Sequence, residues 1–203
     1  MRFYRVAVFL LRYIVLALFR IKIIGKDTVP KGKPLIVCAN HISLWDPVFV
    51  AACCRQPIHF MAKSELFEKP VLKWLLKALG AYPIKRGESD VAAIKKTLTY
   101  LRGTDRVGIF LQGTRNAGQD LESTDVKSGV GMILGHTEVD TLPVTVVTKD
   151  NRVKLFRKVY VVIGKPVPYE QIKAQSKSKE AYKQVSERVF EIICNNAKEV
   201  TKQ

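Results

Sequence analysis

The sequence lacks the spacings of cysteine and histidine that hold structural metals. Its 203 residues include four cysteines and three histidines, with no C-x-x-C pair and no zinc-finger spacing. It also lacks arginine-rich runs interleaved with aromatic residues, which are typical of RNA-binding sheets. We therefore expect no metal site and no nucleic-acid partner.

Cysteine is scarce, and no secretory signal accompanies it. The apolar N-terminal region is split by Arg12 and is not followed by a small-x-small cleavage site. Because the cysteines lie mostly in apolar contexts, we expect reduced core thiols in a protein that faces the cytosol. They are Cys38, Cys53, Cys54 and Cys194.

Acidic residues are also few. Eighteen Asp and Glu stand against 34 Lys and Arg, which gives a net charge of +16. Such a charge indicates a polyanionic partner, and with nucleic acid disfavoured we expect an anionic membrane surface or a phosphorylated or acidic ligand. The chain length predicts one domain, and an apolar content of 47% excludes a disordered chain.

The N-terminal region, residues 3–19, is almost wholly apolar apart from Arg5 and Arg12. A central arginine makes a membrane-spanning helix costly, whereas a helix lying in the interface can extend its arginines toward anionic headgroups. We predict a membrane-associating helix in residues 1–24 and a single domain in residues 25–203, on the cytoplasmic face of the membrane. The alternative is an amphipathic helix that packs on the protein's own core.

The rest of the chain alternates predicted strands with predicted helices. Residues 34–39 form a continuous apolar run, typical of a strand buried on both faces. Residues 46–54 place Asp at a helix N-cap, followed by Pro. The alternation predicts an α/β fold with a mostly parallel or mixed central sheet flanked by helices. Further strands are expected at 58–62, 81–87, 106–111, 141–148 and 158–163, and further helices at 70–79, 90–102, 127–136 and 178–200.

The helix after Pro70 has two interpretations. Its leucines recur at helical spacing, and such a stripe usually faces a core. Basic residues beside an exposed Trp74 would instead suit a membrane surface, so this helix is a candidate for a second interfacial contact. The stripe consists of Leu72, Leu75, Leu76 and Leu79.

Only His41 and its neighbours offer a general base. An imidazole stands directly after a buried strand, and the Asp46 carboxylate follows five residues later. A turn between them could bring Asp46 to one ring nitrogen of His41, fixing the tautomer and stabilising the imidazolium that forms when the other nitrogen takes a proton. Such a pair suits direct activation of a substrate hydroxyl. Ser43 is an alternative nucleophile, although its adjacency suits a turn hydroxyl better.

A second polar cluster follows the predicted strand at 106–111. Open α/β sheets tend to place ligands at such strand ends. No member of the cluster is a nucleophile or a good base at neutral pH, so we expect it to bind rather than to react. The cluster consists of Gln112, Gly113, Thr114 and Arg115.

Four separated segments resemble the sequence blocks of the glycerolipid acyltransferases. Residues 40–46 (NHISLWD) match the N-H-x-x-x-x-D block, and residues 80–86 (GAYPIKR) are similar to the second block. Residues 113–115 (GTR) resemble the end of the E-G-T-R block, and residues 142–144 (LPV) resemble the fourth. Order and spacing also fit over about residues 25–164, and the strongest resemblance is to the 1-acyl-sn-glycerol-3-phosphate acyltransferases.

The resemblance implies a reaction. The base His41, oriented by Asp46, would take the proton from the sn-2 hydroxyl of lysophosphatidate, whose oxygen attacks an acyl thioester of coenzyme A or acyl carrier protein to give phosphatidate. No cofactor is implied beyond this co-substrate. The residues that the resemblance assigns to substrate binding are Lys85, Arg86, Gln112, Gly113, Thr114 and Arg115, and those that support the motifs are Asn40, Ser43 and Pro143.

Gln112 departs from the family, which has Glu at this place. Glutamine keeps the size but loses the charge and gains an NH₂ donor. Three hypotheses follow: a lysophosphatidate acyltransferase, an acyltransferase for another lysolipid or glycerol 3-phosphate, or a catalytically weakened lipid-binding homologue. The presence of both His41 and Asp46 favours an enzyme.

Overall fold

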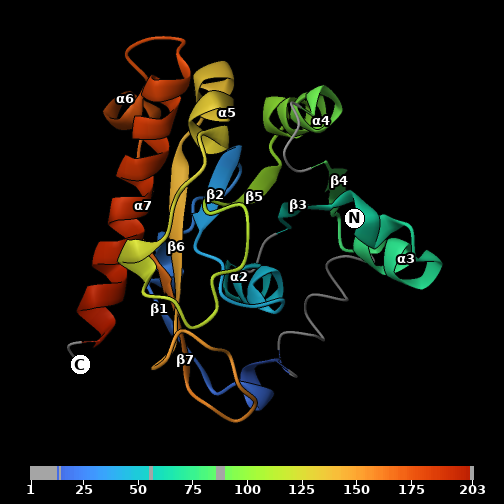
Figure 1. Ribbon diagram of the computed structural model, residues 1–203, viewed down its shortest axis with the longest axis vertical. Helices are drawn as coiled ribbons and strands as arrows, with labels where there is room; N and C mark the ends of the chain where they lie inside the picture. The colour runs from blue at the N-terminus through green and yellow to red at the C-terminus, as the bar shows by residue number, and fades with distance from the viewer. Residues whose placement is uncertain (1–12, 14, 55–56, 86–89, 202–203) are drawn as a thin grey trace.

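The described chain is built around one seven-stranded sheet (Figure 1). The computed structural model describes residues 13, 15–54, 57–85 and 90–201. The strands are β1 (Ile21–Ile24), β2 (Leu35–Ala39), β3 (His59–Lys63), β4 (Tyr82–Ile84), β5 (Arg106–Phe110), β6 (Thr141–Val147) and β7 (Val159–Ile163). Their order is β1-β7-β6-β2-β5-β3-β4, and every neighbouring pair is parallel except β6 and β7. The prediction of an α/β fold with a mixed sheet is confirmed.

Helices cover both faces of this sheet. They are α2 (Asp46–Cys54), α3 (Pro70–Ala78), α4 (Val91–Arg102), α5 (Gly129–Thr137), α6 (Tyr169–Ile172) and α7 (Lys179–Thr201), with short 3-10 helices η1 (Lys26–Thr28), η2 (Ser64–Phe67) and η3 (Leu121–Ser123). Residues of α2 pack on one face of the sheet, whereas α5 and α7 pack on the other (Figure 1). The helices and strands expected from Leu35 onward are present, with small shifts at their ends.

Strand β2 is buried on both faces, as its continuous apolar run predicted. Leu35 and Val37 belong to the core cluster on the α2 side, whereas Ile36 and Cys38 belong to the cluster beneath α5 and α7. All four cysteines are free and buried. Burial raises the pKa of the Cys38 thiol, which therefore stays protonated and packs as a small apolar residue.

The N-terminal segment contributes to the domain core. Most of the helix expected over residues 3–19 lies outside the described residues, but Val15 and Phe19 are buried in the cluster on the α2 side. Residues 21–24, which the prediction placed in the membrane-associating segment, form β1 and pair in parallel with β7. In the described part of the chain, no helix has the length and apolar character needed to cross a bilayer.

Helices α5 and α7 approach each other closely at Gly131. A Cβ atom at this position would lie 2.0 Å from the Tyr182 carbonyl oxygen of α7. The Gly131 amide nitrogen donates a hydrogen bond to Ser186 Oγ at 3.1 Å. Glycine is therefore required for this contact, because any side chain would separate the helices.

Candidate active site

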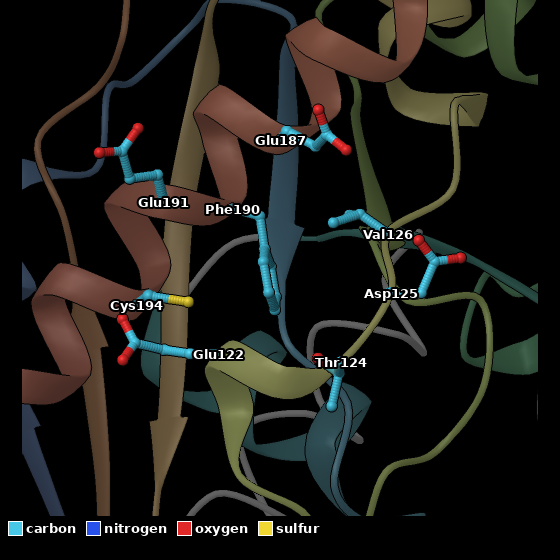
Figure 2. A pocket seen from close by; sticks show the side chains of 8 residues that line it. All are labelled: Glu122, Thr124, Asp125, Val126, Glu187, Phe190, Glu191 and Cys194. Carbon is cyan, nitrogen blue, oxygen red and sulfur yellow. The ribbon is translucent and has the colours of Figure 1, made fainter.

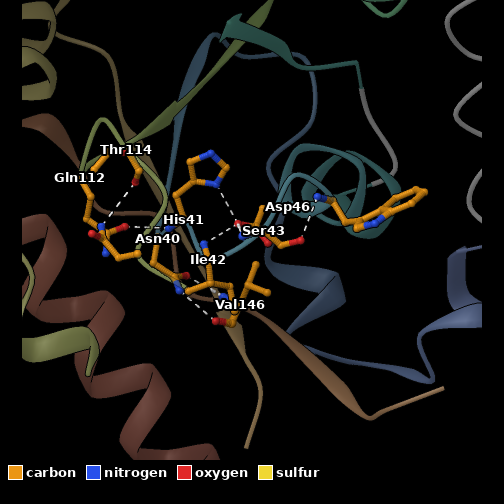
Figure 3. A network of polar contacts seen from close by, with 10 residues as sticks. Asn40, His41, Ile42, Ser43, Asp46, Gln112, Thr114 and Val146 are labelled. Atoms are coloured by element: carbon orange, nitrogen blue, oxygen red, sulfur yellow. Dashed lines mark hydrogen bonds and ion pairs between the residues drawn. The ribbon is translucent and has the colours of Figure 1, made fainter. Parts of the chain in front are cut away.

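The loop between β2 and α2 brings His41 and Asp46 together (Figure 3). His41 Nδ1 lies 2.8 Å from Asp46 Oδ2. The same oxygen accepts hydrogen bonds from the backbone N–H groups of Ile42 at 2.7 Å and Ser43 at 2.8 Å. These three bonds close the loop around the buried Asp46 carboxylate, so the contact expected from the sequence is present.

Asp46 does not cap α2 as the sequence suggested. The helix begins at Asp46, but Oδ2 bonds to residues that precede the helix rather than to N–H groups of its first turn. The imidazole and two N–H groups of the loop together offer this carboxylate oxygen a better set of donors than a single cap bond would. Asp46 therefore shapes the loop and orients His41.

The geometry defines the protonation pattern of His41. Since a carboxylate oxygen only accepts hydrogen bonds, the neutral ring carries its proton on Nδ1 and leaves Nε2 as an acceptor. Nε2 forms no hydrogen bond with any other described residue, and His41 remains 8% exposed. Its ring stacks on Phe110, with centroids 4.1 Å apart. The imidazole is thus held on one side and open to a substrate proton at Nε2.

Ser43 acts as a turn residue. Its Oγ accepts a hydrogen bond from the Trp45 N–H at 3.2 Å, and no hydrogen bond joins the described Ser43 side chain to His41. A Ser-His dyad requires such a bond. The geometry favours the turn hydroxyl over the alternative of a serine nucleophile.

Gln112 does not face a substrate. Its side chain is 1% exposed, and both of its polar atoms bond within the protein. Oε1 accepts a hydrogen bond from the His41 backbone N–H at 2.7 Å, and Nε2 donates to Thr124 Oγ1 at 2.8 Å. The assignment of Gln112 to substrate binding is therefore corrected, because the side chain instead connects the His41 loop to Thr124.

The amide at position 112 matches the hydrogen bonding of Thr124. The Thr124 hydroxyl donates its single hydrogen to the Leu121 carbonyl at 2.8 Å, so its oxygen can only accept from residue 112. An amide NH₂ supplies that hydrogen, whereas a glutamate carboxylate has none to give. The glutamine that replaces the family's Glu is thus matched to Thr124, which needs a donor at position 112.

Two further contacts hold the His41 backbone. The His41 carbonyl accepts from the Asn116 N–H at 2.9 Å, so the segment after β5 binds both backbone groups of His41. Asn40 donates from Nδ2 to the Val146 carbonyl at 2.9 Å and accepts the Val146 N–H at 2.8 Å. No sequence pattern predicts the roles of Asn116 and Val146, because these contacts join segments that are far apart in the chain.

The predicted cationic residues follow the ends of β4 and β5. Because β2, β5, β3 and β4 are parallel, their carboxyl ends meet at the edge of the sheet that carries His41. Lys85 and Arg115 are exposed, and neither forms an ion pair with a carboxylate of the described chain. Gly113 adopts a φ of 68°, which allows the turn between β5 and Arg115. Arg86 lies outside the described residues.

Pro143 lies inside β6, level with the last residues of β2 and β5. It pairs in register with Cys38 of β2, and its carbonyl accepts the Gly164 N–H at 2.9 Å. Three residues later, Val146 of the same strand binds Asn40. Pro143 is therefore part of the framework beneath the His41 loop.

A cavity of about 770 Å³ lies between α4 and α5, beside the Gly113 turn. Phe110, which stacks on His41, also belongs to its lining. Apolar side chains of β4, β5 and α5 form most of its wall. Its charged residues are three exposed lysines and Asp90, whose carboxylate accepts hydrogen bonds from the backbone N–H groups of Lys85 and Ala93. Such a lining suits a ligand with an anionic end and an apolar chain. The lysines are Lys85, Lys127 and Lys179.

A second cavity, of about 300 Å³, has the opposite charge (Figure 2). It lies between α7 and the segment around η3, and carboxylates from both sides line it. Hydrogen bonds from Lys183 and Lys127 lower the pKa of Asp125 to about 2, so this carboxylate is ionised at neutral pH. An anionic substrate is disfavoured there. Among the described residues, no cluster of three His, Cys, Asp or Glu side chains is arranged to hold a metal ion.

Comparison with known proteins identifies the family. The sequence model of the family described as Acyltransferase matches residues 20–147, which include the His41 loop and the Arg115 turn. The chain belongs to the acyltransferase family. The fold agrees with this membership: a crystal structure of the 1-acyl-sn-glycerophosphate (LPA) acyltransferase PlsC from Thermotoga maritima superposes with a TM-score of 0.67 at 24% identity, covering 90% of this chain and 73% of that one.

Several acyltransferases of known name are similar in sequence. A 1-acyl-sn-glycerol-3-phosphate acyltransferase of Streptococcus pneumoniae is 35% identical over 122 residues, 59% of this chain and 44% of that protein. Proteins of the same name from Borreliella burgdorferi and Bacillus subtilis are 31% and 28% identical, over 67% and 72% of this chain and 54% and 73% of theirs. The chain thus spans about half the length of the first two of these acyltransferases.

Proposed function

We propose that this chain transfers an acyl group from a thioester to the sn-2 hydroxyl of 1-acyl-sn-glycerol 3-phosphate, forming phosphatidate. The observation that carries the proposal is the His41 imidazole, bonded at Nδ1 to Asp46 and open at Nε2. Such a base needs a hydroxyl to deprotonate, and no serine of the loop occupies that role. The names of the similar proteins supply the identity of the acceptor.

The chemistry uses His41 twice. Nε2 takes the proton of the acceptor hydroxyl as its oxygen attacks the thioester carbonyl, and Asp46 stabilises the imidazolium that results. When the tetrahedral intermediate collapses, the carbon–sulfur bond breaks and Nε2 returns the proton to the departing thiolate. The His41 N–H donates to Gln112 and the His41 carbonyl accepts from Asn116, which holds the loop, and the bond to Asp46 holds the ring.

Cationic residues at the same sheet edge would hold the acceptor phosphate. Arg115 offers a forked guanidinium that suits phosphate oxygens, and Lys85 follows β4 at the same sheet edge. The resemblance assigns Arg86, which lies outside the described residues, and the Gly113-Thr114 turn to the same role. The adjoining cavity of about 770 Å³ is large enough for part of an acyl chain. The absence of any ion pair between Arg115 and the described carboxylates leaves this cation available.

The donor is acyl-coenzyme A or acyl carrier protein, and no cofactor is required. Coenzyme A is polyphosphorylated and acyl carrier protein is acidic, so the net charge of +16 attracts either. The same charge favours an anionic membrane, and we place the enzyme on its cytoplasmic face. Nucleic acid is not part of this function.

A direct assay tests the proposal. The purified chain is incubated with acyl-coenzyme A or acyl carrier protein and with lysophosphatidate, glycerol 3-phosphate or other lysolipids, and the products are identified. We expect phosphatidate, and we expect His41→Ala to reduce its formation by about two to four orders of magnitude because the general base is lost. His136→Ala is the matched control, since this histidine of α5 is exposed and, among the described residues, its side chain bonds to the Met132 carbonyl of its own helix and has a ring contact with Tyr182.

Three outcomes would contradict the proposal. Turnover by His41→Ala equal to that of the unaltered chain would remove the mechanism. Product from another lysolipid or from glycerol 3-phosphate alone would replace the acceptor, and no product with any pair would favour the weakened lipid-binding homologue. The match between Gln112 and Thr124 argues against such a decayed site, because a degraded position has no reason to be satisfied at both ends.

A further inference from the structure

Helix α3 exposes apolar side chains to an unusual degree. None of its nine residues is buried. Val71 is 80% exposed, Trp74 is 63% exposed and Leu75 is 40% exposed. The expectation that Leu75 belongs to a core-facing stripe is therefore wrong, whereas its neighbours Leu72 and Leu76 are half-buried. Contiguous exposed apolar residues of this size are typical of interaction surfaces.

The sequence divides α3 into three rows. With a turn of 100° per residue, Leu72, Leu76 and Leu79 point toward the domain, and the exposed residues Val71, Trp74 and Leu75 form the outer row. A third row consists of lysines four residues apart, and it adjoins the outer row on the Trp74 side, where Lys77 is three residues from Trp74. They are Lys69, Lys73 and Lys77, and none of them pairs with a carboxylate in the part of the chain that is described.

We propose that α3 docks on an anionic phospholipid bilayer, with Val71, Trp74 and Leu75 entering the interface and the lysine row contacting lipid phosphates. Tryptophan favours the headgroup level of a bilayer, and lysine stems lie along apolar surface while their ammonium groups reach anions. A second copy of the chain is a poor partner for this surface, because it would bring two lysine rows of a +16 protein together.

The position of α3 in the fold relates membrane docking to the active site. The helix follows β3, whose carboxyl end lies at the sheet edge that carries His41. Leu44, in the His41 loop itself, is also exposed. Docking through α3 would hold this edge beside the membrane that contains a lipid acceptor. The inference rests on the proposed function only for that acceptor, since docking is measured without turnover.

The two tryptophans of the chain allow a specific measurement. In the Trp45→Phe variant of the full chain, Trp74 is the sole tryptophan, and its emission reports on α3 alone. We expect a blue shift with vesicles of phosphatidylglycerol and phosphatidylcholine, and quenching by brominated acyl chains. Vesicles of phosphatidylcholine alone should give a much smaller change. The background variant His41→Ala, free of lysophosphatidate, should bind in the same way.

Substitutions test the two rows separately. Val71→Ser with Trp74→Ser should weaken vesicle binding on the order of tenfold, because the apolar insertion is lost. Lys73→Gln with Lys77→Gln should weaken binding by about tenfold on anionic vesicles and leave neutral ones unchanged. Val91→Ser is the matched control, since Val91 is an exposed apolar residue at the start of α4.

Three results would overturn the proposal. The first is vesicle binding without any change in Trp74 emission, which would assign docking to other segments. The second is no vesicle binding at all. The third is a concentration-dependent shift of Trp74 emission without lipid, which would show a second copy on α3. Phosphatidate formation in detergent that depends on His41 would leave the proposed function standing in each case.

Discussion

The Gln112 side chain links the backbone of His41 to the hydroxyl of Thr124. The donors and acceptors fix which way the side-chain amide points. The His41 N–H donates to Oε1, Nε2–H donates to the Thr124 hydroxyl, and that hydroxyl donates to the Leu121 carbonyl. A carboxylate at position 112 would face an oxygen that has no hydrogen left to give. The buried carboxylate oxygen and the Thr124 hydroxyl oxygen would then repel each other. Alternatively, the hydroxyl would turn to the carboxylate and leave the Leu121 carbonyl without its hydrogen bond.

We predict that Gln112→Glu destabilises this protein, by about 1 to 3 kcal/mol. Burial raises the folded-state pKa of the new carboxyl above its unfolded value of about 4.3, so stability is lost as pH rises from the unfolded toward the folded pKa. The melting temperature should therefore fall further below that of the unaltered chain at about pH 8 than at about pH 5. Acyl transfer should fall rather than rise.

A double-mutant cycle with Thr124→Ala serves as the control for this prediction. If Gln112 donates to Thr124, removal of the hydroxyl should cost stability in the native background and cost less when Glu occupies position 112. The coupling should exceed about 0.5 kcal/mol. Strictly additive effects, or higher activity of Gln112→Glu, would show that the amide is not matched to Thr124.

Sequence predicted the contact of His41 with Asp46 because both residues lie within one turn of the chain. It assigned Gln112 to the substrate because a polar residue after a buried strand ordinarily faces the ligand edge. The partner that buries Gln112 is the backbone of a residue 71 positions away, and the second partner is a threonine in an irregular segment. Neither contact has a periodic or spacing signature.

Among the elements, the α5–α7 contact depends on a single glycine. Gly131→Ala would place a Cβ 2.0 Å from the Tyr182 carbonyl oxygen, so α5 must move from α7. We expect a loss of about 1 to 3 kcal/mol, which for a chain of this size lowers the melting temperature by roughly 3 to 10 °C. Thermal unfolding followed by circular dichroism measures this change.

Gly129→Ala provides the matched control in the same helix. No atom lies within 4 Å of a Cβ built at Gly129, and alanine favours helix more than glycine does. This variant should be neutral or slightly more stable. Equal losses in both variants would mean that the contact with Tyr182 does not explain the loss of stability in Gly131→Ala.

The periodicity of apolar residues predicted most helices and strands, with β1 as the main exception. β2 and β5 are continuous apolar runs, and α4 and α7 have clear apolar stripes, so local pattern sufficed. β1 was missed because Ile21–Ile24 continues an apolar stretch that reads as helix. Only its pairing with β7, near the other end of the chain, makes it a strand. Similarly, the exposure of α3 follows from its place beyond the sheet, which no stripe reveals.

Across the whole molecule, the net charge of +16 should govern encounter with acidic donors. We predict that kcat/KM for acyl carrier protein falls steeply as salt is raised from about 0.1 M to about 1 M, where the screening length shrinks from ~10 Å to ~3 Å. Steady-state rates measured with soluble donor and a fixed amount of lipid test this. A rate that does not respond to salt would contradict electrostatic attraction, provided that the melting temperature shows an intact fold.

The fold class was predictable at this scale because strands and helices alternate along the chain. The order of the strands was not, since the antiparallel pairing of β6 with β7 and the return of β1 to the sheet edge depend on long-range packing. Charge likewise predicted an anionic partner but not the separation of a lysine-lined cavity from an acidic one.

The bonds from Gln112 and Asn116 to the two backbone groups of His41 make the base and the Arg115 turn one rigid unit. The separation between the backbones of His41 and Arg115 is then a property of the fold and not of the bound lipid. In the proposed reaction this fixed spacing would select acceptors by the number of bonds between their phosphate and their reacting hydroxyl. Acceptors with a longer or shorter separation would fit poorly. Positional selectivity would thus be encoded in backbone hydrogen bonds that no substrate touches.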